Sequence, residues 1–410
     1  MKKSSLSIAI IIISSNLLLS GCQTGQTKVV AAPEVLAEFD FSIDEGKIIL
    51  PVQFKGQEYP FLLDTGATGT IFDDSFKDKL GNRFLWPKSA TLARGRKAKI
   101  EYYRYPDASL GPLKFNDLNL IGVLDCDLWF GSKTPIKYRG IIGMDILKKY
   151  IVQIDFDNGK VTFFKGKQEF DLFSMFKPKE NTHPEWGEAI QMKNPLFSNK
   201  RFFVTGNLPD NTKAEFLIDS GWYTTNALNT KLFKKVKSEY PVFADDENIT
   251  TDNEASQNRK IVNSFSLGNY EYENIMFQKN NESILGYDFL SRHIVTFDFP
   301  NKIMYFKKGN NYDKQPPIHI ILGDTRFTIN SRSHAVEIID PNSLAYEKGI
   351  REKDVLFMIN HYDISSLNVA ELMNLPVSAD ENNEIIFTFK RGDEVFIVEF
   401  TKQDLEQNRD

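Results

Sequence analysis

Two stretches of the sequence share one pattern: Phe61-Leu62-Leu63-Asp64-Thr65-Gly66 and Phe216-Leu217-Ile218-Asp219-Ser220-Gly221. Each places an aspartate directly after a short apolar run of the kind that forms a buried strand. Burial of a carboxyl group there costs free energy unless the group is hydrogen-bonded, and the glycine after it permits a tight turn. A single Asp-Thr-Gly triplet is most often only a turn, so its meaning here depends on the second copy.

The two triplets belong to an internal repeat of the chain. Residues 143–157 and 286–300 match at seven of fifteen positions without a gap, and both follow two aliphatic residues. Gly111 lies 47 residues after Asp64, and Gly268 lies 49 residues after Asp219, each at the end of a Ser-Leu-Gly triplet. Short apolar segments separated by turns indicate strands. The sequence therefore predicts a mainly β protein with two related lobes.

The repeat gives the paired aspartates a chemical meaning. Pseudo-twofold packing of two lobes would bring Asp64 and Asp219 together. Two carboxyl groups in one site hold a single proton between them, because both cannot ionise cheaply. The ionised member can act as a general base on a bound water, while the protonated member polarises a carbonyl group. This chemistry needs neither a nucleophilic side chain nor a metal, so we expect no metal and no cofactor.

On these residues the sequence resembles the aspartic proteases, specifically bacterial two-lobed relatives with retropepsin-like lobes, over about residues 40–308. The resemblance implies two pseudo-twofold related acid-protease β-barrel lobes, as in pepsin-like enzymes, and a polypeptide substrate. It also implies that Asp64 and Asp219 are the catalytic pair. In the family, the residues that follow each aspartate support the pair, and here these are Thr65, Gly66, Thr68, Ser220 and Gly221.

The surroundings of the triplets leave alternatives open. Lobe two has Trp222-Tyr223 where lobe one has Ala67-Thr68, so Trp222 either lines a specificity pocket or marks a lobe that has lost activity. In the family a hairpin closes over the substrate, and residues 94–103 are the candidate here. Its residues Tyr102 and Tyr103 either contact substrate or only decorate a strand. Trp129 and Phe130, in an insertion of lobe one, are candidates for substrate contact or for packing.

The first residues carry the features of an export signal. Lys2 and Lys3 precede an apolar stretch that is too short and too interrupted for a comfortable membrane span. It ends in Leu18-Leu19-Ser20-Gly21-Cys22, which resembles the bacterial lipoprotein signal, where cleavage precedes a cysteine that is acylated. The resemblance implies anchoring of a cell-envelope protein through Cys22. Gln23 favours the outer membrane, with the protein facing the periplasm; an ordinary signal peptide is the alternative.

The last part of the chain has the pattern of a separate small domain. Residues 334–360 follow a strand, helix, turn and strand order, and residues 385–390 and 395–400 are predicted to form a closing hairpin. This order resembles the bacterial PDZ pattern, which implies a small α+β domain that binds an extended peptide at a sheet edge. A structural cap that binds nothing is the alternative.

The expected organisation follows from these segments. It comprises a lipoprotein signal peptide (1–21), a tether (22–38), protease lobe one (39–165), a linker (166–184), protease lobe two (185–308), a second linker (309–317) and a PDZ domain (318–403).

Composition narrows the function classes further. The chain has 410 residues, of which 41% are hydrophobic, with a net charge of −5 and two cysteines. This charge gives no reason to expect nucleic-acid binding, and two cysteines cannot make a disulfide framework. Both lobes lie in one chain, so we expect a monomer. The sequence predicts a membrane-anchored aspartic endopeptidase, with an inactive peptide-binding or scaffold lipoprotein of the same fold as the alternative.

Overall fold

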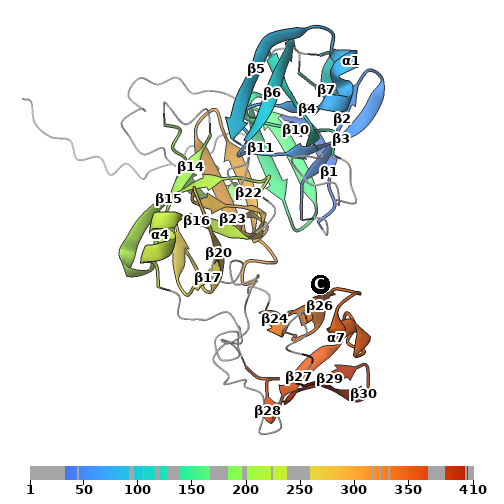
Figure 1. Cartoon of the computed structure of the whole chain (residues 1–410). Helices are drawn as coiled ribbons and strands as arrows, with labels where there is room; N and C mark the ends of the chain where they lie inside the picture. Colours follow the sequence, from blue (N-terminus) through green and yellow to red (C-terminus); the bar gives the residue numbers. More distant parts are fainter. Residues whose placement is uncertain are drawn as a thin grey trace, which may run out of the picture.

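The computed structural model describes residues 33–43, 46–91, 97–104, 106–115, 120–126, 138–166, 183–195, 201–222, 225–237, 259–314, 318–322, 325–330, 333–367, 384–401 and 404. Within them the chain forms two β lobes and a smaller C-terminal domain (Figure 1). The predicted mainly β fold with two related lobes is confirmed. No helix of the described residues is long and apolar enough to span a bilayer. The predicted signal peptide and Cys22 lie outside those residues.

Each lobe is built on one sheet, and the two sheets share a strand order. The sheet of lobe one runs β5 (Arg83–Thr91), β6 (Lys97–Arg104), β9 (Leu120–Leu124), β4 (Ile71–Asp73), β10 (Gly140–Ile142), β3 (Gln57–Leu63), β2 (Ile49–Phe54), β7 (Ala108–Leu110) and β8 (Leu113–Lys114). The sheet of lobe two runs β17 (Arg259–Val262), β20 (Ile275–Asn280), β16 (Asn226–Asn229), β21 (Ile284–Leu285), β15 (Thr212–Ile218), β14 (Phe203–Leu208), β18 (Phe265–Leu267) and β19 (Tyr270–Tyr272). From β6 onward the first order corresponds to the whole of the second.

Strand β3 shows how the apolar runs before the aspartates are used. Phe61 and Leu63 enter the main core, while Leu62 faces a second buried cluster on the other side of the sheet. All three side chains are fully buried. A strand that is covered on both faces is apolar without alternation, which is why the three residues directly before Asp64 include no polar one.

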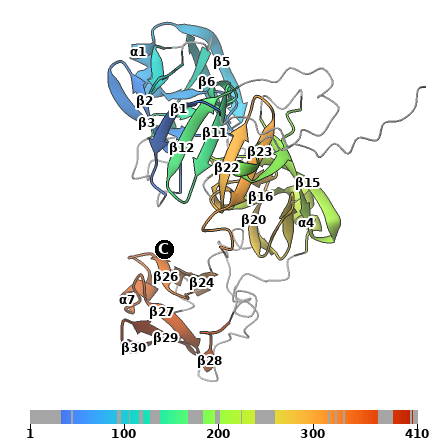
Figure 2. The ribbon, with the colours of Figure 1, turned by 180° about the vertical axis from the view of Figure 1, so that it is seen from behind.

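A six-stranded sheet joins the two lobes. Its order is β1 (Val35–Asp40), β12 (Lys160–Lys165), β11 (Tyr150–Asp155), β22 (His293–Asp298), β23 (Ile303–Lys308) and β13 (Glu188–Gln191). Figure 2 shows β12, β11, β22 and β23 side by side. The antiparallel pair β11 and β22 is centred on Gln153 and Thr296, whose side chains hydrogen-bond at 2.8 Å. Each lobe gives three strands, so the sheet orients one lobe relative to the other.

The helices of the described residues are short. Two of them, α3 and α6, follow Gly143 and Gly286 and so occupy equivalent places in the two copies of the repeat. The α-helices are α1 (Lys77–Leu80), α3 (Met144–Leu147), α4 (Thr230–Lys235), α6 (Tyr287–Leu290) and α7 (Leu344–Glu347), and the 3₁₀ turns are η1 (Asp74–Phe76), η4 (Pro184–Trp186) and η5 (Pro209–Asn211).

Two segment boundaries differ from the expected ones. Strand β1 begins at Val35, inside the segment expected to be a tether, because its half-buried residues pair with β12 at the edge of the six-stranded sheet. The second linker, expected from Gly309, remains packed on lobe two at its start. Tyr312 is buried there, with its ring centroid 5.8 Å from that of Tyr270 and 5.2 Å from that of Tyr272.

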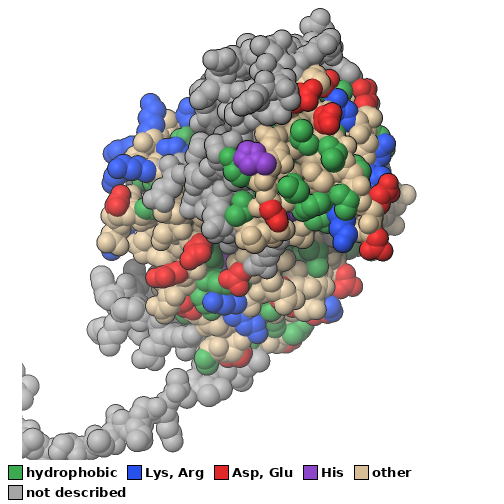
Figure 3. Space-filling model, turned by 90° about the horizontal axis from the view of Figure 1, so that it is seen from below, with side chains coloured by type: hydrophobic (Ala, Val, Ile, Leu, Met, Phe, Trp, Pro, Cys, Tyr) green, Lys and Arg blue, Asp and Glu red, His purple; other side chains and the backbone are tan. Residues whose placement is uncertain are grey.

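The C-terminal domain consists of two small sheets and helix α7. The first sheet contains β24 (Ile318–Leu322), β25 (Thr325–Ile329) and β26 (Val336–Ile339), and the second runs β28 (Tyr362–Asp363), β27 (Val355–Ile359), β29 (Glu384–Arg391) and β30 (Glu394–Thr401). The predicted closing hairpin is confirmed by the pairing of β29 with β30. On the face seen from below, apolar side chains lie among charged ones (Figure 3). On edge strand β30, Val395 and Ile397 are 57% and 61% exposed.

Replacement of Gly143 by alanine should destabilise the fold. A Cβ at this position would lie 2.5 Å from the carbonyl carbon and oxygen of Gly69, and backbone atoms cannot rotate away. Overpacking of this kind costs about 1–3 kcal/mol of unfolding free energy, which urea denaturation would measure. Gly69→Ala is the matched control, because its Cβ would meet Asp145 Oδ2 at an ordinary 3.5 Å. Equal losses in both variants would contradict this account of the contact.

Candidate active site

The two aspartates are held by equivalent backbone contacts. Asp64 follows β3, and its N–H donates to the carbonyl of Ile142 at 3.0 Å. Asp219 follows β15, and its N–H donates to the carbonyl of Leu285 at 3.1 Å. In both lobes the acceptor strand runs parallel to the strand that carries the aspartate. The repeated aliphatic-aliphatic-glycine elements are therefore the partners of the two aspartate loops.

Thr65 and Ser220 bind the two loops to each other. Thr65 Oγ1 donates to the carbonyl of Ile218 at 2.8 Å and accepts from the N–H of Ser220 at 3.0 Å. Ser220 Oγ donates to the carbonyl of Leu63 at 2.9 Å and accepts from the N–H of Thr65 at 3.1 Å. Both hydroxyls are buried and use donor and acceptor together. The four bonds form a reciprocal bridge between the lobes.

Gly66 and Gly221 let the carboxyl groups come close. A Cβ built on Gly66 would collide with the carboxyl group of Asp219, and one on Gly221 would collide with that of Asp64. Each carboxyl group therefore lies against the glycine of the opposite lobe. This reciprocal contact places Asp64 and Asp219 in one site, as the sequence predicts, and it requires glycine at both positions for space.

The two carboxyl groups have different environments, which shift their pKa values to different extents. Burial raises the pKa of Asp64, although the N–H groups of Ala67 and Gly66, both 2.8 Å from its Oδ1, oppose that rise. Burial, and then the neighbouring Asp64 charge, raise the pKa of Asp219 well above its usual range. The two carboxyl groups hydrogen-bond to each other. The pair therefore holds one proton, and the two N–H donors at Asp64 Oδ1, against the Gly221 N–H at Asp219 Oδ1, favour Asp64 as the carboxylate.

The residues just after the triplets lie differently from expectation. The side chain of Thr68 is exposed, and the groups that donate to Asp64 Oδ1 are the backbone N–H groups of Gly66 and Ala67. Trp222 is only 7% exposed and packs with Leu217 and Ile284, while its Nε1 donates to the carbonyl of Thr225 at 2.6 Å. The side chain therefore packs inside lobe two, whereas the sequence had left a pocket wall and a lobe that has lost activity as its two interpretations. Tyr223 lies outside the described residues.

The two tyrosines of the candidate hairpin point to opposite faces of the sheet. Strands β5 and β6 do form an antiparallel hairpin, whose tip at residues 92–96 lies outside the described residues. Tyr103 is buried in the main core, and its hydroxyl donates to Glu101 at 3.0 Å. Tyr102 is half-buried and packs against the same apolar cluster as Ala67 of the Asp64 loop. Tyr102 is thus the one on the loop's side. Trp129 and Phe130 also lie outside the described residues.

A further set of polar residues, which the sequence motifs did not indicate, supports the two loops. In lobe one, Asp145 accepts from Thr70 N–H at 2.9 Å and from Thr70 Oγ1 at 2.7 Å. In lobe two, Asp288 accepts from Asn226 Nδ2 at 3.2 Å. Asp145 and Asp288 are matched positions of the repeat, so the match itself was the available signal. Their partners differ in type, which hid the pairs.

One acidic cluster in the described residues has the spacing of a cation site. Oxygens of Asp73, Asp74 and Asp125 all lie within 4.8 Å of one another. Asp73 is already engaged, because Arg139 Nη1 lies 3.2 Å from its Oδ1 and the N–H of Cys126 donates to its Oδ2 at 3.0 Å. These contacts tie Asp73 to the segments that carry Cys126 and Arg139.

One protein family matches part of the chain. Residues 50–146 match the family described as aspartyl protease, and this segment contains Asp64 and the Gly143 element. The match supports a peptidase. No curated protein sequence matches the chain. Among solved structures, the aspartic proteinase from Irpex lacteus is similar at 14% identity and a TM-score of 0.39, over 67% of this chain and 97% of that one.

Loss of the interlobe bridge should lower stability. Ser220→Ala leaves the buried N–H of Thr65 without its acceptor, which costs about 1–3 kcal/mol of unfolding free energy. Thr65→Val should cost a similar amount. The double variant should lose less than the sum, because both hydroxyls belong to one network. Urea denaturation of the three variants forms the cycle, and strictly additive losses would contradict a shared bridge.

The dyad should also make stability depend on pH. The pKa of Asp219 is higher in the folded protein than in the unfolded chain, so the folded protein binds more protons. The stability that this proton binding contributes is fully present below the ordinary aspartate pKa and is lost as pH rises through the raised pKa. Asp219→Asn removes that titration, so its stability should fall less between about pH 4 and pH 7. Urea midpoints across this range are the measurement. Asp107→Asn, on an exposed side chain, should keep the parental slope.

Proposed function

We propose that this chain is a membrane-anchored aspartic endopeptidase, which hydrolyses peptide bonds with water activated by the Asp64/Asp219 dyad. The observation that carries the proposal is the reciprocal placement of the two carboxyl groups, each against the glycine of the other lobe. Two buried carboxyl groups in contact are costly for stability alone, whereas they are suited to acid–base chemistry.

The protonation states define the proposed steps. Asp64, as the carboxylate, takes a proton from a water molecule whose oxygen attacks the scissile carbonyl carbon. Asp219 gives its proton to the carbonyl oxygen, which forms a neutral tetrahedral diol. When the C–N bond breaks, the proton on Asp64 passes to the leaving nitrogen, and one diol hydroxyl returns a proton to Asp219. The dyad is then restored with its single proton.

The backbone of lobe two supports activity over the scaffold alternative, which Trp222-Tyr223 had favoured. Its Trp222 carbonyl accepts from the N–H of Tyr287 at 2.9 Å, as the Ala67 carbonyl accepts from that of Met144 in lobe one. The bulky residue therefore leaves the loop in the geometry of its counterpart. Its ring fills the space behind the loop, where Gly286 lets it approach.

The remaining parts of the proposal concern substrate and location. Tyr102, on the side of the Asp64 loop, is the proposed substrate contact of the β5–β6 hairpin. The C-terminal domain is proposed to be a PDZ domain that binds an extended peptide. Acylation of Cys22 would anchor a monomeric enzyme to the outer membrane, facing the periplasm, since two or three acyl chains give stable anchoring.

Soluble protein that starts at Gln23 should cleave members of a mixed peptide library, and Asp64→Asn should not. Loss of the general base is expected to lower kcat by a factor of about 10²–10⁴. New peptide termini, read by mass spectrometry from acidic to mildly basic pH, are the measurement. Asp107→Asn is the control and should cleave like the parent. Unchanged cleavage by Asp64→Asn would overturn the assigned dyad, and no cleavage by any form would favour the scaffold alternative.

A further inference from the structure

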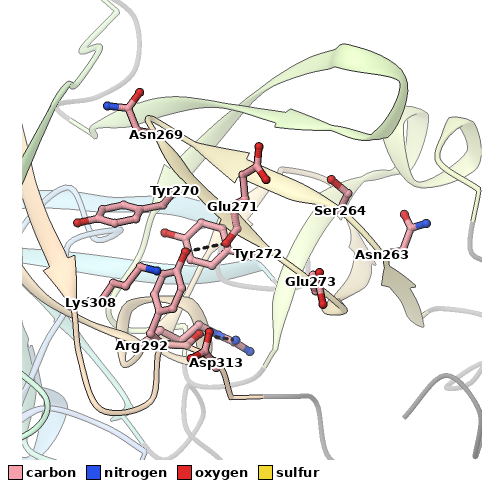
Figure 4. A pocket seen from close by; sticks show the side chains of 11 residues that line it. Asn263, Ser264, Asn269, Tyr270, Glu271, Tyr272, Glu273, Arg292, Lys308 and Asp313 are labelled. Atoms are coloured by element: carbon pink, nitrogen blue, oxygen red, sulfur yellow. Dashed lines mark hydrogen bonds between the residues drawn. The ribbon is translucent and has the colours of Figure 1, made fainter. Parts of the chain in front are cut away.

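A buried arginine joins lobe two to the segment that leads into the C-terminal domain. Arg292 follows α6 and is 2% exposed. Its Nη1 donates to the carbonyl of Tyr312 at 3.4 Å and to that of Lys314. Figure 4 shows the guanidinium group beside Asp313, below the tyrosine rings at the edge of the lobe. Residues 309–314, which we name the linker segment, are therefore held on lobe two by a fully buried cation.

The linker segment has further attachments around this arginine. The N–H of Gly309 donates to the carbonyl of Arg292 at 2.9 Å, and the hydroxyl of Tyr312 donates to the carbonyl of Glu271 at 2.6 Å. Lys308 Nζ lies 3.9 Å from the centroid of the Tyr312 ring, within cation–π distance. The segment is thus a packed part of the lobe up to Lys314.

The same arginine reaches toward the Asp219 loop through Asp288 and Asn226. Arg292 Nη2 lies 3.7 Å from Asp288 Oδ2, which accepts from Asn226 Nδ2 at 3.2 Å. Asn226 Oδ1 accepts from the N–H of Gly286 at 3.1 Å, directly after Leu285, whose carbonyl holds Asp219. Each link joins buried or half-buried groups at 3.7 Å or less, so the contacts are continuous from Arg292 to the Asp219 loop.

A second route from the C-terminal domain ends at the same asparagine. Ile261 and Met276 are cross-strand partners on β17 and β20 of lobe two, yet both belong to the buried apolar cluster that forms the core of the C-terminal domain. The carbonyl of Met276 accepts from Thr225 Oγ1 at 2.8 Å and from Asn226 Nδ2 at 3.4 Å. Thr225 in turn holds the indole of Trp222. Met276 therefore links the two parts: it belongs to the apolar core of the C-terminal domain, and its carbonyl binds Thr225 and Asn226 next to the Asp219 loop.

Lobe one provides the internal comparison. Lys149 occupies the place in the repeat that Arg292 occupies in lobe two, but its side chain is only half-buried. Thr70, a shorter residue than Asn226, ties Asp145 to the Asp64 loop, and its Oγ1 also accepts from the N–H of Gly143 at 3.2 Å. The buried arginine and the longer asparagine are therefore found in the lobe that carries the C-terminal domain.

We propose that Arg292 is a positioning residue that couples the linker segment of the C-terminal domain to the Asp219 loop through Asp288 and Asn226. The catalytic meaning of this coupling rests on the proposed function, whereas the coupling itself does not. A peptide bound at the C-terminal domain changes the Asp219 loop to the extent that it prefers one arrangement of the linker segment over another. The C-terminal domain is then a controlling element of lobe two and not only a substrate-capturing one.

Hydrogen exchange of the full-length chain from Gln23 tests the coupling without reference to activity. Arg292→Gln removes charge-assisted bonds, so exchange should become about 10- to 100-fold faster at residues 309–314 and also at residues 219–222 and 225–228. Arg292→Lys should restore part of the protection. Lys149→Gln is the matched control in lobe one and should change neither segment.

A second variant, which keeps both Arg292 and Asp288, distinguishes the coupling from a general loss of folding. Tyr312→Ala loosens the linker segment without removing the buried charge, and it should speed exchange at residues 219–222 as well. Faster exchange of the linker segment with an unchanged Asp219 loop, in both Arg292→Gln and Tyr312→Ala, would overturn the proposal. If the parent cleaves peptides, Arg292→Gln should lower kcat more than it changes KM. If the parent cleaves nothing, the proposed function fails while the exchange data still decide the coupling.

Discussion

The reciprocal contact between the two aspartate loops is the constraint on which the rest of the structure depends. Two buried carboxyl groups can lie together only if one proton is shared and if their backbones are fixed from both sides. Thr65 and Ser220 supply that fixation with four hydrogen bonds across the lobes, and Gly66 and Gly221 leave room for the opposite carboxyl group. The six-stranded sheet serves the same end, because it sets the lobe orientation in which these bonds form.

Within this twofold arrangement, the two lobes differ in ways that matter for chemistry. Asp64 accepts from two backbone N–H groups at 2.8 Å, while Asp219 accepts from Gly221 N–H at 3.0 Å and faces the charge of its partner. The twofold fold therefore gives the two carboxyl groups different hydrogen-bond donors. The second difference lies behind the loops, where Asn226, Asp288 and Arg292 connect lobe two to the C-terminal domain.

The fold could be predicted from the sequence because the repeat consists of residue types that strongly constrain local structure. A glycine after an aliphatic pair, or an aspartate after an apolar run, is compatible with few local structures. Two copies of both motifs in the same order are compatible with fewer folds still. The reasoning was weaker for side chains whose role depends on what faces them. A pocket wall was one interpretation of Trp222, because aromatic residues often line clefts. In the structure Gly286 leaves a space behind the loop, and the Trp222 ring fills it. Thr68 was expected to hold Asp64, and backbone N–H groups do so instead.

The sequence by itself determined that two lobes of one fold exist, where each aspartate loop begins, and that a hairpin-closed domain follows them. Those features rest on short-range rules, such as periodicity, turn chemistry and repeat spacing. Only the tertiary structure decided that Tyr102 and not Tyr103 shares the face of the Asp64 loop, that Val35 already belongs to a strand, and that Arg292 is buried against the linker segment. These outcomes depend on contacts between segments that are far apart in the sequence, and no short stretch of sequence specifies such contacts.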